Sequence, residues 1–448
     1  MYVIYIHIKN THFYILLYII MIITKIHNKY YNIENFNHPG GKDAIWHAYG
    51  RDATTMFEMY HPFVNKETLQ IILKKYETTV DEAKSYLLLG ENNVPQFEYD
   101  TDFSKEVKQE VFDYFKNQAT QNNTTIRKIT KASSSRWTLI TLLNILRILS
   151  MYWWLTGSIY GMFAFPLFSW LASVNCFHDA CHFSMSDNSK VNKVCSYSGI
   201  EYYTPLIWYY QHNISHHAYT NIKDKDVDIY HSKKIIRLSN YTKYSHVYKY
   251  QPLLVILQYL FSNLGTEIKN SIKIYKHTYF NIIPRYNVYC MEILDKIVFF
   301  THFICRYVIL YYWFDNLFSV LIPMFLSNAL FVINTQINHL HDDKFHNEKD
   351  WYKHQVLASS NHSIPKKNPN LYHLFSYIFS GGLNYQIEHH LFPGVNHCHY
   401  PHIQSIIEKI CKKYNITYKS FNGYYDAFCS YYKHICSLSI DDSKQKLN

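Results

Sequence analysis

The sequence predicts a mainly α-helical protein: a small α+β module at the N-terminus, then a four-span helical membrane domain with a helical cap on its cytosolic side. Three observations predict this fold. The chain has 448 residues, which is long for a single core. Charged residues make up only 17% of it, and the apolar residues are concentrated in a few long runs. Polar segments rich in histidine lie just outside those runs.

The net charge and the cysteines narrow the class of protein. A net charge of +10 suits either nucleic acid or an anionic membrane surface, but the basic residues are scattered and no nucleic-acid-binding motif occurs. We therefore expect a lipid membrane as partner and no nucleic acid. The nine cysteines are widely spaced and include no Cys-x-x-Cys pair, which predicts reduced thiols facing the cytosol.

The first elements predict a cofactor-binding module. The apolar run at residues 13–23 is shorter than the roughly 20 residues that span a bilayer, so we interpret its end as a buried strand. His38 then lies in a His-Pro-Gly-Gly sequence, where glycines let the backbone approach a flat cofactor. His61 is the second candidate. Two neutral imidazoles on opposite faces of a haem would suit electron transfer, because they leave no position open to oxygen. The simpler alternative is a turn with a surface histidine.

Residues 22–88 resemble the cytochrome b5 family. The resemblance lies in the strand before His-Pro-Gly-Gly, in the Gly-Arg-Asp-Ala-Thr segment at 50–54 and in the later histidine. It implies a haem domain over about 22–90, with haem b held by His38 and His61. His47 lies outside the family's ligand pattern, and the family's usual first strand with its tryptophan is missing or replaced by the apolar leader.

The next element is a pair of membrane spans. Residues 137–177 contain a single charged residue, Arg147, and are long enough for two spans of about 137–157 and 158–177. The turn between them is expected at Gly157-Ser158. A charge at mid-span is costly in lipid, so Arg147 must have a partner or face protein.

A second pair of spans is predicted at 297–314 and 317–338, and the flanking charges orient both pairs. Basic residues precede the first span, while neither turn between paired spans contains Lys or Arg, so each pair returns the chain to the cytosol. Between the pairs, the apolar stretch 252–265 is too short to span and predicts an interfacial helix. Residues 437–448 are expected to form a disordered tail.

Three histidine-rich segments fall on the predicted cytosolic face, at 177–184, 208–221 and 381–393. Their spacing alone carries no weight, because so many histidines produce such pairs by chance. Their positions, close to the predicted spans and on one side, are the evidence. Histidines at i and i+4 share a helix face, so each helix could direct two imidazoles at one metal ion. Imidazole suits iron, copper and zinc, and no tight Cys/His cluster points to a structural zinc site.

These segments resemble the membrane fatty-acid desaturase superfamily, over about residues 95–420. The match also includes the sequences at 99–115 and 220–229. The resemblance implies two non-haem irons, with the chemistry at the metal rather than at a catalytic side chain. The implied ligands are His178, His182, His212, His216, His217, His389 and His390, with Gln386 in a variant position and His339 after the fourth span. We expect Asp179 to orient an imidazole; Asp226 and Asp228 either do the same or are solvated.

Gln386 stands where many relatives have histidine. Together with the cytochrome b5-like module, it is similar to the front-end desaturases, which insert a double bond between an existing one and the carboxyl end. For residues 95–448 this implies O2-dependent desaturation of a fatty-acyl chain in the endoplasmic reticulum membrane. The metal site and haem domain would face the cytosol, and the NADH-dependent cytochrome b5 reductase would supply electrons through the haem domain.

The chemistry explains why these parts occur together. An unactivated C–H bond is too strong for any side-chain acid or base, so a cofactor must carry the oxidation. Each turnover forms one double bond and reduces O2 to two waters, which requires two additional electrons. A fused donor makes their delivery intramolecular. Two alternatives stay open: a sphingolipid long-chain-base desaturase or lipid hydroxylase on the same scaffold, and a non-catalytic membrane haem or metal protein.

Overall fold

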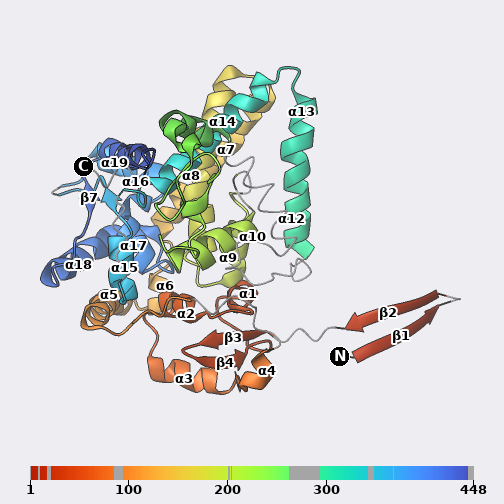
Figure 1. The fold of residues 1–448 in the computed structure, drawn as a ribbon, viewed down its shortest axis with the longest axis vertical. Coiled ribbons are helices and arrows are strands. Elements are labelled where there is room, and N and C mark those ends of the chain that lie inside the picture. The colour runs from red at the N-terminus through yellow and green to blue at the C-terminus, as the bar shows by residue number, and fades with distance from the viewer. Residues whose placement is uncertain are drawn as a thin grey trace. The chain divides into compact units, whose positions relative to one another are not determined.

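The computed structural model describes residues 2–8, 11–17, 22–84, 94–199, 202, 204–261, 293–341, 348–366 and 368–441. The chain forms two compact units. The first comprises residues 1–54 and 64–94, and the second comprises 55–63 and 95–448. The structure is mainly helical and has a small α+β part near the N-terminus, which confirms the predicted fold class (Figure 1).

The first unit is built on two small antiparallel sheets. β1 (Tyr2–Ile8) and β2 (Thr11–Leu17) pair as a hairpin. The second sheet has the order β3-β4-β5, formed by β3 (Ile23–Ile26), β4 (Lys29–Asn32) and β5 (Glu77–Thr78). Ile23 is fully buried at the start of β3, so the end of the apolar run is a buried strand as predicted.

Short helices complete this part of the chain. They are α1 (Lys42–Ala48), α2 (Thr54–Tyr60), α3 (Lys66–Lys74) and α4 (Val80–Lys84). α3 begins at an Asn65 cap, whose side chain accepts from the Thr68 N–H and so satisfies one of the helix's unpaired donors. Apart from Thr54, the residues of α2 belong to the second unit.

The second unit contains the long apolar helices. α7 (Ser134–Leu155) and α8 (Ile159–Cys181) lie side by side, and α14 (Phe318–Gln336) packs on α8 (Figure 1). Gly157 has φ +80° in the turn between α7 and α8, a conformation that glycine adopts without strain, so the turn lies where it was predicted. Trp154 Nε1 donates to the Ser319 carbonyl at 2.7 Å, which joins α7 to α14.

Three helices among the described residues are long and apolar enough to cross a membrane, at Ile126–Leu155, Ile159–Cys181 and Phe318–Gln336. The predicted span at 297–314 is helical throughout 297–313, but a π-helical turn at Cys305–Ile309 interrupts it. Four spans therefore stay a prediction. Arg147 lies inside α7, as expected, and donates to the Ser198 carbonyl, the kind of partner that a charge at this depth requires.

The second unit also contains several shorter helices. They include α5 (Asp102–Gln121), α15 (Trp351–Leu357), α16 (Leu371–Ser380), α17 (Gln386–Leu391), α18 (Tyr400–Lys413) and α19 (Tyr424–Ser437). α5 is amphipathic: Phe103, Val107, Val111 and Phe115 recur every fourth residue and are all buried.

Two smaller predictions have mixed outcomes. Residues 251–261 are helical, in agreement with the helix predicted at 252–265 as far as the description extends. The disordered tail predicted at 437–448 is wrong at its start, because Ser437 ends α19 and Leu438 is buried. Residues 442–448 lie outside the described part. The cysteines that the structure describes are all free thiols, as predicted.

Candidate metal centre

Three local structures carry the histidines of the three predicted histidine-rich segments, which we call the first box (177–184), the second box (208–221) and the third box (381–393). His178 lies in the last turn of α8, and His182 follows as its C-cap. The second box forms a π-helix, η2 (Tyr209–His217), and the third box forms α17. Gly381 and Gly382 precede α17 with positive φ, and a Cβ on Gly381 would come within 2.7 Å of the Val174 carbonyl oxygen. Only glycine fits such a close approach, which places the third box against α8.

The predicted metal ligands come together in two groups. In the first, the ring nitrogens of His178, His182, His212 and His389 lie within 4.8 Å of one another. In the second, those of His216, His339 and His390 meet the same limit. His217 lies between the groups: its Nε2 is 3.1 Å from His212 Nε2, and its ring stacks on that of His390 at 4.2 Å. Every predicted histidine of the three boxes, with His339, is buried here.

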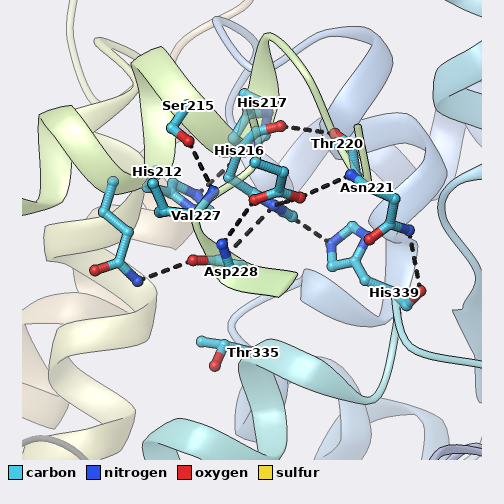
Figure 2. Close-up of polar contacts among 12 residues, drawn as sticks. His212, Ser215, His216, His217, Thr220, Asn221, Val227, Asp228, Thr335 and His339 are labelled. Carbon is cyan, nitrogen blue, oxygen red and sulfur yellow. Dashed lines mark hydrogen bonds and ion pairs between the residues drawn. The ribbon is translucent and has the colours of Figure 1, made fainter. Parts of the chain in front are cut away.

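The second box differs from the prediction in one respect. His212 and His216 were expected to face one metal ion, as histidines four apart on an α-helix would. In the π-helix, however, it is His212 and His217, five residues apart, that approach each other, while His216 turns to the second group (Figure 2). The wider π-helical turn is the reason, since residues five apart share its face. This single helix therefore serves both groups.

Outer hydrogen bonds hold the rings in place. His182 Nδ1 lies 3.0 Å from the Tyr60 hydroxyl and His389 Nδ1 lies 3.2 Å from the Tyr400 hydroxyl. In the second group, His216 Nδ1 lies 3.1 Å from Asp226 Oδ2, and His339 Nδ1 lies 3.0 Å from the Ala358 carbonyl oxygen. His390 Nδ1 lies 2.9 Å from Gln355 Oε1. With Nδ1 engaged, Nε2 is left facing the centre, which is how outer partners orient metal-binding histidines.

The surroundings of the buried histidine rings suit bound metal ions better than hydrogen bonds between the rings. His182, His389 and His390 each have an Nε2 without a hydrogen-bond partner among the described residues. A buried polar atom without a partner is costly, and a cation bound at that lone pair removes the cost. Burial, together with neighbouring imidazoles, lowers the pKa of all three well below the usual value. The rings are therefore neutral near pH 7, the state in which imidazole binds metal.

His216 and His339 show how charge is distributed in the second group. Burial lowers the pKa of His339 to about 3. Burial also acts to lower the pKa of His216, but the carboxylates of Asp226 and Asp228 outweigh it and raise the pKa. Asp226 is buried and bonds directly to His216, so it orients an imidazole rather than being solvated. Asp228 is shared between His216 and His231.

Gln386 lies at the edge of the second group. Its Nε2 is 2.8 Å from His339 Nε2, and its Oε1 has no hydrogen-bond partner among the described residues. Asp179 contacts an imidazole, as expected, but mainly that of His397, whose Nδ1 is 2.8 Å from Asp179 Oδ1. Its distance to His178 Nδ1 is 3.9 Å.

Several members of the site were missed by sequence reasoning. They are Tyr60, Gln355, Tyr400 and His397. His397 follows the third box closely in the sequence, and this proximity could have marked it as a candidate. Tyr400 also lies close in the sequence to its partner His389, whereas Tyr60 and Gln355 lie far from theirs, and no local pattern marks these three residues.

A pocket adjoins both groups, and its wall includes His178, His212, His216 and His339. Apolar side chains form much of the rest of the wall, namely Trp208, Ile229, Phe331, Val332, Leu340 and Leu383. Phe331 and Val332 come from α14, one of the helices able to span a membrane. An apolar chain could therefore lie here beside the histidines.

The two candidate haem ligands lie in different units. In the first unit, His38 Nδ1 accepts from the Gly40 N–H at 2.9 Å in the turn before α1. In the second unit, His61 follows α2, and its Nδ1 lies 2.7 Å from the Phe57 carbonyl oxygen, which orients the ring. Burial lowers the pKa of His61, so its imidazole is neutral near pH 7. Their pairing on one haem stays a prediction.

The matches to known protein families agree with the predictions for both parts of the chain. The family model "Fatty acid desaturase" matches residues 149–422, and "Cytochrome b5-like Heme/Steroid binding domain" matches residues 22–80.

Similar proteins extend over most of the chain. The Dictyostelium discoideum "Delta(5) fatty acid desaturase A" is 30% identical, over 85% of this chain and 82% of its own length. The "Acyl-lipid (8-3)-desaturase B" of the same organism is 29% identical, over 88% and 86%. The Mortierella alpina "Acyl-lipid (8-3)-desaturase" is 28% identical, over 88% of each chain. The chain belongs to the fatty acid desaturase family, a family of oxidoreductases, and carries a cytochrome b5-like domain at its N-terminus.

Proposed function

We propose that this protein is a front-end fatty-acyl desaturase. It would use O2 and two non-haem irons to insert a double bond between an existing one and the carboxyl end of the chain. Electrons would enter through a haem b held by His38 and His61. The observation that carries the proposal is the pair of buried histidine groups. Some of their Nε2 atoms have no hydrogen-bond partner among the described residues, and other members of both groups line a pocket that is apolar in part.

The proposed iron ligands divide between the two groups. His178, His182, His212 and His389 would hold one iron, and His216, His339 and His390 the other, with His217 between them and Gln386 at the edge of the second. When bound, the two irons would supply the oxidising chemistry that breaks unactivated C–H bonds, which side-chain acids and bases cannot do.

The protein's own residues would position the irons and the substrate. Asp226, Gln355 and Tyr400 hold ligand rings by their Nδ1 atoms, which keeps each Nε2 directed at the centre. Phe331 and Val332 contribute an apolar wall beside these rings, against which an acyl methylene chain would be held. Burial of this wall and of the rings would keep bulk water away from the reacting carbons.

The electron source and the location complete the proposal. Forming the double bond removes two hydrogens from the acyl chain, and reducing O2 to two waters takes up these and two further electrons with two protons. Those electrons would come from NADH through cytochrome b5 reductase and the haem domain, where fusion raises the effective concentration of the donor. The protein would span the endoplasmic reticulum membrane several times, with the metal site and haem domain on the cytosolic side.

Expression in a yeast host fed defined unsaturated fatty acids tests this function. Mass spectrometry of the products should locate each new double bond on the carboxyl side of a bond already present. The names of the relatives, two of which are acyl-lipid (8-3)-desaturases, support this class of product. New double bonds only on the methyl side, or only in sphingoid bases, would contradict the front-end assignment.

A further inference from the structure

We propose that Tyr60 is a positioning residue that couples His61 to the histidine centre, so that an electron from the haem enters the centre at His182. This inference rests on the proposed function, since it takes His61 as a haem ligand and His182 as an iron ligand. The reduced haem would lose one electron and the iron centre would gain it. Tyr60 itself would be unchanged, and the haem would be reduced again by the NADH-dependent reductase.

The geometry that carries the inference is one hydrogen bond and one stretch of backbone. Tyr60 is the last residue of α2, and its hydroxyl lies 3.0 Å from His182 Nδ1. His61 is the next residue in the chain. The link from one imidazole to the other therefore consists of covalent bonds and a single hydrogen bond. Electrons couple through such links more strongly than across gaps of the same length.

The segment that contains Tyr60 is held firmly in the second unit. Thr55, at the start of α2, bonds through its hydroxyl to that of Tyr99 at 2.8 Å. Just beyond α2, the Phe63 ring stacks on that of Phe392, with centroids 5.5 Å apart. The Tyr60 ring also packs edge-on against Phe183, the neighbour of His182. Because both ends of the segment are anchored, the distance from the Tyr60 hydroxyl to His182 is well defined.

Tyr60 differs from the other residues that orient ligand rings. Asp226, Gln355 and Tyr400 bond to ligand histidines in the same manner, but all three come from the desaturase part of the sequence. Tyr60 comes from the region that matches the cytochrome b5-like family model.

The test compares Tyr60→Phe with Tyr400→Phe in the full-length, haem- and iron-loaded protein. Each variant removes one phenol hydroxyl from the Nδ1 of a ligand histidine, but only the first interrupts the link to His61. Anaerobic flash photoreduction by a soluble flavin would reduce the haem, and the decay of the ferrous absorbance would follow its oxidation by the iron centre. Both variants remove an outer partner of a ligand histidine, so any loss common to them reports on ring orientation. We expect Tyr60→Phe to slow the decay clearly more than Tyr400→Phe does, because only Tyr60→Phe interrupts the link to His61.

The haem spectrum, haem midpoint potential and non-haem iron content of Tyr60→Phe should match the wild type. Decay at the wild-type rate in Tyr60→Phe, equal slowing in both variants, or loss of iron from Tyr60→Phe would each overturn the inference. Failure of the proposed function is recognised separately: the wild type would then bind no non-haem iron, or His61→Ala would keep its haem spectrum.

Discussion

Gln386 is the member of the site whose chemistry differs most from that of its neighbours. Its side chain lies against His339 in the second group, with a buried Oε1 that has no partner in the described part of the chain. A neutral amide oxygen is a weaker ligand than imidazole. Gln386 is therefore suited to tuning one iron or holding a bound water, rather than to fixing the metal tightly.

We predict that Gln386→Ala lowers the activity roughly 10- to 100-fold, which is the usual loss when an outer partner in a metal site is removed. The protein should still accumulate in membranes with its haem, because the seven histidines of the boxes and His339 are unchanged. Gln386→His should keep some iron without the full rate. Product yield in the yeast assay measures the effect, and Gln109→Ala, which changes an exposed glutamine on α5, is the matched control. Full activity in Gln386→Ala would remove this residue from the site.

The haem ligands give a second prediction at this scale. His38→Ala and His61→Ala should each abolish the bis-imidazole haem spectrum while leaving non-haem iron in place, because neither residue belongs to the histidine groups. His47→Ala, which changes a histidine in α1, should keep the spectrum. Absorbance of the purified variants measures this. Normal haem spectra in both His38→Ala and His61→Ala would refute the assignment.

The site residues that could be predicted from the sequence are those that belong to a short local motif. The boxes, together with His339 at the exit of a long apolar helix, could be found because position and sequence context coincide there. Tyr60 and Gln355 could not be found, because their partners, His182 and His390, lie far along the chain and any tyrosine or glutamine could occupy such a place. Tertiary packing alone brings these pairs together.

At the scale of elements, η2 explains how one helix can serve two metal groups. Its π-helical turn brings His212 and His217 together and frees His216 for the second group. The sequence predicts a helix in this region but not its winding, since a π-helix is less stable than an α-helix and is held by its surroundings. Ser215 shows one such contact: its hydroxyl donates to the Lys225 carbonyl at 2.5 Å.

α17 gives a pH-dependent prediction. Burial raises the pKa of Glu388 to about 7, against hydrogen bonds from Tyr418 and Asn361 that lower it. A raised pKa means that the folded chain binds this proton more tightly than the unfolded chain. The stability from Glu388 is therefore fully present below the ordinary pKa of 4.5 and is lost as the pH rises through about 7.

Glu388→Gln should accordingly lose less thermal stability than the wild type between about pH 5 and pH 8. Melting temperatures of the detergent-purified proteins measure this. Glu110→Gln, which changes an exposed carboxylate on α5, should follow the wild type. Parallel pH profiles for Glu388→Gln and the wild type would show that Glu388 does not titrate in this range.

The long helices give a prediction of topology. We expect four spans with both termini cytosolic, because the basic residues flank the first span and all three boxes must meet at one centre. Glycosylation acceptors placed near Gly157 and Asp315 should be modified, whereas one in the region 340–380 should not. Gel shifts after expression in a eukaryotic host measure this. The reverse pattern would place the centre on the wrong side of the membrane.

At the scale of the whole molecule, the order of the two predicted domains follows from the composition of the chain and from its apolar runs and motifs. Apolar runs predicted the helical membrane part, and the His38 turn predicted a separate module before it. The sequence could not show that residues 55–63, inside the region predicted as that module, pack with the second unit. That assignment depends on contacts such as the Phe63 ring on Phe392, between segments far apart in the chain.

The central claim is that the two histidine groups hold two irons in a protein that also binds haem. Metal analysis of the purified full-length chain, combined with its haem absorbance, tests this claim most directly. The arrangement of the groups predicts about two non-haem irons and one haem for each chain. Zinc in place of iron, or a chain that binds haem but no other metal, would contradict it.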